Sequence, residues 1–184
     1  MVIGVLALQG AVSEHVTLLQ TLGATVRELR EPQELAELDG LVLPGGESTT
    51  MRKLLDRVGM LTPLRKLVAS GLPVFGTCAG MVLLAQPESL NALPATIQRN
   101  GFGRQRESFE AELAVTGFET LYHGVFIRAP YYSAVDPSVT VLATVNDDRI
   151  VAARYQHLLV TAFHPELTED TRFHQLFLEM VTGK

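Results

Sequence analysis

The feature of this sequence that most constrains the fold is an alternation of apolar, strand-length runs with helical patterns, up to about residue 85. The runs are VIGVLAL, ATVREL, DGLVLPGG and LPVFG, and segments with helical spacing of apolar residues, such as AVSEHVTLLQTLG, follow most of them. Strands that are apolar on both faces and alternate with helices form a parallel sheet that helices cover. We therefore predict an α/β fold with a flavodoxin-like first half.

The second half has a different pattern, because strand-like segments follow one another quickly from about Ala95 onward. They are ATIQRNGF, SFEAELAV, GVFIRAP, VTVLATVN, RIVAARY and LLVTAFHP, and an amphipathic helix, DTRFHQLFLEMV, comes after them. A chain of 184 residues without a linker is long enough for one well-filled core. We expect residues 1–184 to form one domain, a three-layer sandwich with a mixed, mostly parallel sheet and helices on both faces.

Capping residues predict where the helices of the first half begin and end. Gly23 closes the first helix, and Ser48 or Thr49 begins the second. The third helix is expected to have Thr62 as its cap and Pro63 in its first turn.

The composition argues against several classes of protein. The 15 basic residues are scattered among 20 acidic ones, for a net charge of -5, so nucleic acid is not an expected ligand. A single cysteine cannot form an intramolecular disulfide, and the opening MVIGVLALQG lacks the basic region of a signal peptide. No apolar run approaches the roughly 20 residues of a membrane helix. We expect a soluble, cytoplasmic protein with no cofactor and no metal.

The only cysteine, Cys78, stands where the run PVFG meets the helical pattern AGMVLLA. The glycines of G-x-C-x-G relieve crowding at a sharp strand-to-helix turn, which matches the nucleophile elbow with cysteine in the serine position. A helix N-terminus favours a thiolate, and the amide of Ala79 can face the oxygen of a tetrahedral intermediate. These features indicate acyl transfer, although a buried, unreactive cysteine explains the elbow alone equally well.

A candidate base follows the last apolar strand, in the segment AFHPELTEDT. We expect this segment to be extended, so that His164 and Glu166 face the same side and Pro165 keeps the backbone straight. A cysteine nucleophile needs a base, and the base needs an orienting partner. For the tripeptide alone, two solvated polar residues at a strand end remain the alternative.

The other four histidines have no such partner nearby in the sequence. His15 and His174 fall in helical patterns, and His123 and His157 fall near strand starts. They are expected to lie on the surface or to serve in packing.

A glycine-rich break follows another buried strand, in LVLPGGESTT. Its glycines let backbone N–H groups approach a ligand, and the amide of Gly46 can serve as a second oxyanion donor. In isolation, a turn with a capping serine explains this segment better. However, this loop, Cys78 and His164 all follow the carboxyl ends of predicted strands, where open α/β sheets bind ligands. We therefore expect them to form one site.

Several segments together carry a family resemblance: GVLALQGAVSEH, LPGGESTT, PVFGTCAGM, RNGFGRQRESFEAEL, GVFIRAPY and TAFHPELTEDTRFHQLFLEM. The chain resembles the class I, triad-type glutamine amidotransferases and, within them, the glutaminase subunits of pyridoxal 5'-phosphate synthase. Many hydrolases and amidotransferases share G-x-C-x-G or H-P-E, whereas LALQGA, PGGEST and FGRQ are specific to this branch. The resemblance runs nearly end to end.

This resemblance implies hydrolysis of L-glutamine to L-glutamate and ammonia, which a separate synthase subunit uses to build pyridoxal 5'-phosphate. It makes Cys78 the nucleophile, His164 the base and later the acid, and Glu166 the residue that orients His164. It also implies a set of glutamine contacts, namely Gly46, Glu47, Ser48, Arg99, Ile127 and Arg128.

Two features bear on the arginines. A guanidinium suits the α-carboxylate of glutamine, so at least one of Arg99 and Arg128 is expected to bind it or to steady a loop that does; pairing with a surface acid is the alternative. The segment QPESLNALPATIQ, Gln86–Gln98, is shorter than the family usually has and lacks its Gly-Leu-rich stretch. We expect an altered flap near the site, which concerns Arg99 more than Arg128.

Gln9 and Gly10 follow the first strand, in LQGAVSEH, and the sheet rule places them at the same edge as Cys78 and Gly46. An ordinary turn explains them without any further role. The resemblance favours a second explanation, in which this edge docks the synthase subunit and docking turns the Gly46 amide toward the oxyanion. The enzyme would then be switched on by its partner.

Two other functions remain open from the sequence. One is a cysteine hydrolase of similar architecture that acts on an ester, a peptide or another amide. The other is a non-enzymatic subunit that keeps the fold to bind and regulate a partner, although the intact set of Cys78, His164 and Glu166 argues against it.

Overall fold

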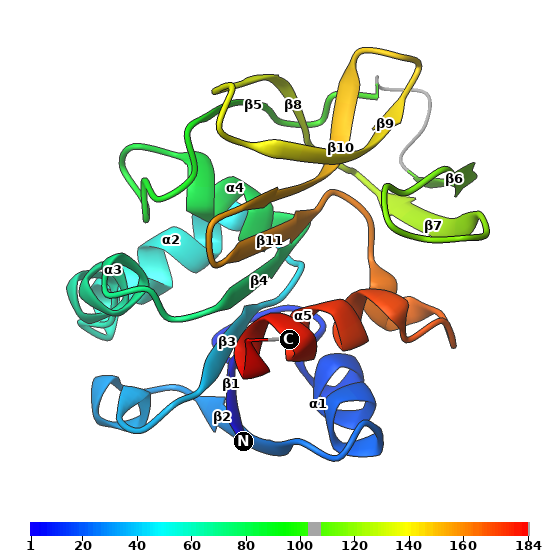
Figure 1. Ribbon diagram of the computed structural model, residues 1–184. Helices are drawn as coiled ribbons and strands as arrows, with labels where there is room; N and C mark the ends of the chain where they lie inside the picture. Colours follow the sequence, from blue (N-terminus) through cyan, green and yellow to red (C-terminus); the bar gives the residue numbers. More distant parts are fainter. Residues whose placement is uncertain (103–107, 184) are drawn as a thin grey trace.

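The computed structural model describes residues 1–102 and 108–183. In these residues, parallel strands line up in the order β2-β1-β3-β4, and β11, from late in the chain, lies parallel beside β4 (Figure 1). This is the order of a flavodoxin-like sheet, so the prediction for the first half is confirmed. The bounds are β1 Val2–Leu6, β2 Thr25–Leu29, β3 Gly40–Leu43, β4 Val74–Thr77 and β11 Leu158–Thr161.

The second half extends the same sheet with antiparallel strands. β10 pairs with β11, β9 and β8, and β8 pairs with β5 at the far edge. A separate hairpin, β6 with β7, lies beside this extension (Figure 1). The sequence did not indicate β8, because only one of its side chains is fully buried. The bounds are β5 Ala95–Gln98, β6 Ser108–Leu113, β7 Tyr122–Ile127, β8 Tyr131–Val135, β9 Thr140–Val145 and β10 Arg149–Tyr155.

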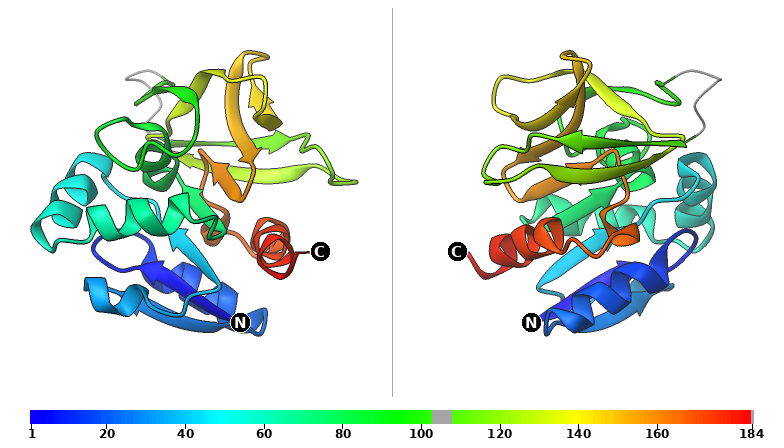
Figure 2. Two further views of the ribbon diagram at one scale, coloured as in Figure 1. Left: turned by 60° about the vertical axis from the view of Figure 1, so that its left-hand side comes forward. Right: turned by 90° about the vertical axis from the view of Figure 1, so that its right-hand side faces the viewer.

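Helices cover both faces of the parallel strands (Figures 1 and 2). α1 and α5 lie together on one face, and α2, α3 and α4 lie on the other. The expected three-layer α/β sandwich with a mixed sheet is therefore confirmed. The bounds are α1 Val12–Thr21, α2 Ser48–Arg57, α3 Leu61–Ala69, α4 Ala79–Ala85 and α5 Arg172–Thr182, with short 3₁₀ turns at η1 Pro32–Leu35 and η2 Pro165–Leu167.

Two of the predicted helix caps are wrong. Glu47 caps α2 in place of Ser48 or Thr49, because its carboxylate accepts hydrogen bonds from the backbone N–H groups two and three residues further on. α3 begins at Leu61, so Thr62 lies inside the first turn with Pro63 and does not cap it. Gly23 follows the end of α1 with φ +86°, as predicted.

The central strands determine where the site can form. All residues of β3, β4 and β11 are buried, which matches strands covered on both faces. Thr77 pairs in register with Thr161, and Leu43 pairs with Gly76, so these strands end together. The loops that follow them therefore meet at one edge. No helix in residues 1–102 and 108–183 is long and apolar enough to cross a membrane.

Candidate active site

The strand-to-helix turn at Cys78 has the geometry of the predicted elbow. Cys78 has φ 47° and ψ -100°, a backbone conformation that non-glycine residues rarely adopt, and its N–H donates to the Thr161 carbonyl at 2.8 Å. A Cβ on Gly80 would lie 2.1 Å from the Leu43 carbonyl oxygen, and one on Gly76 would lie 2.8 Å from the backbone of Gly80. The two glycines are thus required for α4 to start this close to β3.

His164 and Glu166 lie together beyond the end of β11. The Nδ1 atom of His164 is 2.7 Å from Oε1 of Glu166, and both residues are buried. The expected extended segment is wrong, because Pro165 begins the 3₁₀ turn η2 and places Glu166 on that turn. The predicted pair forms nonetheless, since a tight turn after His164 also brings the carboxylate back to the ring.

The imidazole of His164 has an unusual affinity for its proton. Burial lowers the pKa of His164, but hydrogen bonds to the side chains of Cys78 and Glu166 outweigh burial and raise the pKa to about 10. Glu166 occupies Nδ1, so the Nε2 atom of His164 is left for the thiol side. An imidazole that keeps the proton favours the thiolate form of a paired cysteine.

The PGGES loop is packed between His164 and the segment after β1. A Cβ on Gly45 would lie 2.3 Å from Cε1 of His164, and one on Gly10 would lie 1.7 Å from the Gly45 carbonyl oxygen. That carbonyl accepts a hydrogen bond from the N–H of Ala11 at 3.2 Å. The side chain of Gln9 accepts one from the N–H of Glu47 at 2.9 Å. Gln9 and the residues after it therefore fix how this loop is presented.

A cavity of about 810 Å³ opens in front of Cys78 and His164. The six glutamine contacts that the resemblance implied all line it, as do Gln9 and Ala79, while Glu166 lies behind His164. Sequence reasoning missed five further lining residues, none of which carries a charged side chain. They are Val82, Asn100, Phe102, Ala129 and Pro130.

Glu47 and Arg99 meet at the rim of this cavity. Nη2 of Arg99 lies 3.2 Å from Oε1 of Glu47, and both side chains are about half exposed. Hydrogen bonds from Thr50 and Thr49 lower the pKa of Glu47 to about 2, so this carboxylate is charged at neutral pH. The pair holds the segment after β5 against the start of α2. Most of the FGRQ motif, residues 103–105, lies outside the described residues.

Comparison with known proteins agrees with this geometry. The model of the SNO glutamine amidotransferase family matches residues 5–183. The chain belongs to this family.

Individual relatives of this amidotransferase cover nearly its whole length. It is 54% identical to a protein of Geobacillus kaustophilus named "Pyridoxal 5'-phosphate synthase subunit PdxT", over 98% of this chain and 95% of that one. A protein of Listeria welshimeri with the same name is also 54% identical, over 96% and 97% of the two chains. A crystal structure described as glutamine amidotransferase superposes with a TM-score of 0.92 at 45% identity, covering 99% of this chain and 100% of that one.

The expectation for the remaining histidines of this amidotransferase needs correction. His15 and His174 do serve in packing, since both are completely buried, but they are also hydrogen-bonded to each other at 2.9 Å. His15 lies 3.5 Å from Glu166, and the exposed His123 contacts two glutamates of the β6–β7 hairpin. Sequence reasoning missed these partners because they come from other elements.

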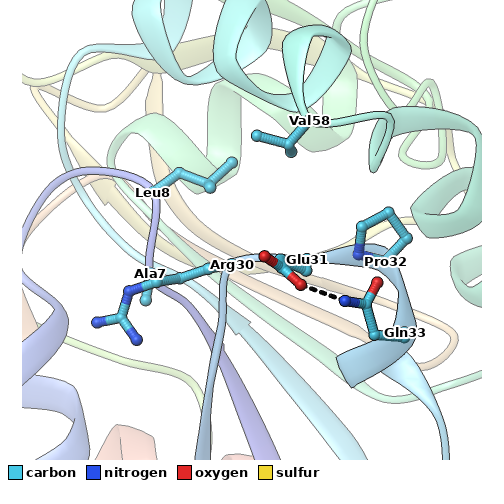
Figure 3. A pocket seen from close by; sticks show the side chains of 7 residues that line it. All are labelled: Ala7, Leu8, Arg30, Glu31, Pro32, Gln33 and Val58. Carbon is cyan, nitrogen blue, oxygen red and sulfur yellow. Dashed lines mark hydrogen bonds between the residues drawn. The ribbon is translucent and has the colours of Figure 1, made fainter.

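A second hollow, of about 550 Å³, lies at the ends of β1 and β2. Leu8 and Val58 lie on one side of it, and Glu31 lies on the other side, where it accepts a hydrogen bond from Gln33 (Figure 3). The residues that line it offer no thiol, hydroxyl or imidazole. The candidate nucleophile, Cys78, and the candidate base, His164, line the first cavity instead.

Proposed function

We propose that this chain hydrolyses L-glutamine to L-glutamate and ammonia through a thioester on Cys78. The single observation that carries the proposal is the convergence of three side chains from two motifs that lie far apart in the sequence. Cys78 and His164 face one cavity, and Glu166 bonds the far side of the His164 ring. Membership of a glutamine amidotransferase family supports the same reaction.

In the proposed first step, Nε2 of His164 holds the proton that the thiol has given up, and the sulfur attacks the carboxamide carbon of glutamine. The tetrahedral intermediate collapses as the His164 imidazolium returns that proton to the leaving nitrogen, which departs as ammonia. A water molecule then gives a proton to His164 and attacks the thioester carbon. Collapse of the second intermediate breaks the carbon–sulfur bond, the sulfur regains the proton, and glutamate leaves.

The oxyanion of both intermediates needs preorganised donors. We assign the backbone N–H groups of Ala79 and Gly46, because both residues line the cavity beside Cys78. The carbonyl of Gly45 bonds Ala11, and in a trans peptide the N–H of Gly46 points the opposite way, away from the start of α1. The orientation of this one peptide plane therefore decides whether the second donor is in place.

The remaining proposed contacts are at the rim and suit the two charges of an amino acid. The anionic Glu47 matches the α-ammonium group, and the guanidinium of Arg99 or Arg128 matches the α-carboxylate. Ser48 offers a hydroxyl, and Ile127 also lines the cavity.

Ammonia release tests the proposal directly. The chain is assayed with L-glutamine, with and without a candidate synthase subunit, beside asparagine, simple esters and peptides. We expect that, among these substrates, only glutamine releases ammonia, and that a thioester can be trapped on Cys78. Turnover of an ester or peptide in preference to glutamine would replace the proposal with a different cysteine hydrolase.

We further propose that the ammonia goes to a pyridoxal 5'-phosphate synthase subunit in the cytoplasm, within a complex of the two chains. The name carried by the relatives supports this partner. Gln9 and Gly10 are the proposed point of coupling, because they contact the loop that carries the Gly46 donor. Docking at this edge would rotate the Gly45–Gly46 peptide and complete the oxyanion hole, and a misplaced donor costs roughly 10²- to 10³-fold in turnover.

Gln9→Ala tests this coupling. The isolated chain is expected to show low glutaminase activity that rises strongly when the synthase subunit is added, and Gln9→Ala is expected to lose that rise with little change in melting temperature. Arg30→Ala, in the second hollow, is the matched control for a surface change at the same edge. Full activity of the isolated chain, or normal activation of Gln9→Ala, would rule the coupling out.

A further inference from the structure

The carboxylate of Glu166 is approached from two sides, and the proposed reaction uses only one of them. Its Oε1 atom faces His164. Its Oε2 atom is buried and has no hydrogen-bond partner within 3.5 Å of suitable geometry among residues 1–102 and 108–183. The Nε2 atom of His15, on α1, lies 3.5 Å from it. A buried carboxylate oxygen without a donor is costly, so this neighbour is important.

His15 is itself part of a buried chain of polar groups. Its Nδ1 atom is 2.9 Å from Nε2 of His174 on α5, and its Nε2 atom is 3.2 Å from the hydroxyl of Thr77, the residue before Cys78. His15, Thr77 and His174 are all fully buried, and Nδ1 of His174 has no partner among the described residues. This series of polar side chains runs from α5 through α1 to the back of Glu166.

Hydrogen-bond accounting selects one tautomer for each ring. If His15 carries its proton on Nε2, that N–H donates to the hydroxyl of Thr77 while Oε2 of Glu166 lies 3.5 Å from the same nitrogen, and Nδ1 accepts from the N–H of His174. Of the two described rings, the atom left over is then an acceptor, Nδ1 of His174. In the opposite arrangement, a lone pair of His15 faces the carboxylate, and His174 has a buried N–H without an acceptor. The first arrangement has the lower cost.

We propose that His15 is a positioning residue, whose Nε2–H holds Glu166 in the orientation that His164 needs, and that His174 fixes the tautomer of His15. This inference rests on the proposed glutaminase function. The contact joins α1 to the back of the site, where neither glutamine nor the nucleophile reaches.

The electrostatics of the pair fit a neutral donor. Burial, and then the proximity of His174 and of His164, hold the pKa of His15 well below 6.5. Burial also lowers the pKa of His174 to about 4. Both rings are therefore uncharged at neutral pH, so each has one donor and one acceptor, as the tautomer argument requires.

Two amide substitutions test the position of the donor. In His15→Gln the side-chain NH₂ reaches the place of Nε2, whereas in His15→Asn it reaches only the place of Nδ1. We expect His15→Asn to lower kcat for glutamine by roughly 10- to 100-fold with KM nearly unchanged, because a misplaced base slows chemistry more than binding. We expect His15→Gln to keep most of the wild-type kcat.

His157→Asn is the matched control. His157 is partly buried and hydrogen-bonds the Val68 carbonyl at 2.9 Å, at the opposite edge of the sheet, so this variant should lose stability without losing kcat. Wild-type kcat in His15→Asn, or equal losses in His15→Asn and His15→Gln, would overturn the positioning role.

The role of His174 is tested by a double-mutant cycle. His174→Phe keeps an aromatic ring where the His174 ring already contacts Phe75, and it removes the donor to His15. Because His174 acts through His15, we expect a smaller loss of kcat than in His15→Asn, and no added loss in the double variant. Additive losses would overturn the link between the two rings.

The tautomer of His15 is read without any activity measurement. In the intact chain with ¹⁵N-labelled histidine, NMR at neutral pH should show His15 protonated on Nε2 and His174 protonated on Nε2. A proton on Nδ1 of His15 would overturn the inference, whatever the substrate proves to be. Absence of glutaminase activity in the wild type would instead overturn the proposed function and leave this measurement intact.

Discussion

The front and back of Glu166 give two histidines opposite properties. On the cavity side, His164 faces a thiol and a carboxylate, and these hydrogen bonds raise its pKa to about 10 in spite of burial. On the core side, beyond His15, His174 contacts the neutral ring of His15 and the ring of Phe75, and burial lowers its pKa to about 4. The same imidazole group thus becomes a proton carrier or a fixed neutral donor according to its partners.

The largest effect is expected from removing the thiol. Cys78→Ala should lose at least about 10⁴-fold in glutamine turnover, because no nucleophile remains, while circular dichroism shows an intact fold. It should also lower the pKa of His164, since one of the two groups that raise it is gone, and leave that of His174 unchanged. NMR titration checks both pKa values. Ammonia release at the wild-type rate would remove the mechanism.

The second prediction compares the two residues of the front pair. His164→Ala should be more damaging than Glu166→Gln, because the latter keeps an imidazole near the sulfur. Glu166→Gln should still lower the turnover rate by roughly 10²- to 10⁴-fold. His164 and His15 face the two carboxylate oxygens of Glu166, and a glutamine side chain offers only one acceptor oxygen in their place. Steady-state rates decide the order. An inactive Glu166→Gln beside an active His164→Ala would reverse these roles.

The third prediction concerns acid stability and the back pair. Below pH 6.5 the unfolded chain protonates His174, but the folded chain does not until about pH 4. The folded state therefore has its full stability above pH 6.5 as far as His174 is concerned. As the pH falls, protonation of His174 favours the unfolded chain, and the unfolding free energy drops by roughly 3 kcal/mol by pH 4. Urea titrations across this range measure the loss.

His174→Phe supplies the comparison for that experiment. The groups that face His174 are His15 and, beyond it, Glu166, and His15 also has a lowered pKa. We therefore expect the slope of stability against pH to become shallower in the variant without vanishing. An unchanged slope would show that protonation of His174 does not contribute to the loss of stability at acid pH.

The smallest effect is expected at a third histidine with carboxylate partners. His123 lies between Glu110 and Glu112 on the exposed hairpin, and hydrogen bonds to these carboxylates raise its pKa. Solvent screens such pairs, so His123→Ala should change neither glutamine turnover nor, appreciably, the melting temperature. A large loss of turnover or of melting temperature would mean that exposure does not weaken the His123 contacts, and that burial is not what makes the His164–Glu166 pair important.

Much of the fold and the candidate site follows from local sequence. The G-x-C-x-G turn, the PGGES loop and H-P-E each follow a buried strand, and parallel strands bring such ends to one edge. The helix start at Glu47 was mispredicted because the Glu47 side chain reaches its own backbone and replaces the expected cap. The segment after His164 was mispredicted because Pro165 begins a 3₁₀ turn there. β8 escaped detection because only one of its side chains is fully buried.

By itself, the sequence determined the parallel first half, the elbow and the pairing of His164 with Glu166, since each depends on residues close together in the chain. Only the tertiary structure decided what stands behind Glu166. His15 and His174 are 159 residues apart, and their helices meet because both cover the same face of the sheet. Helical spacing predicts that such side chains are buried, but it contains no information about which polar group from another helix will complete their hydrogen bonds.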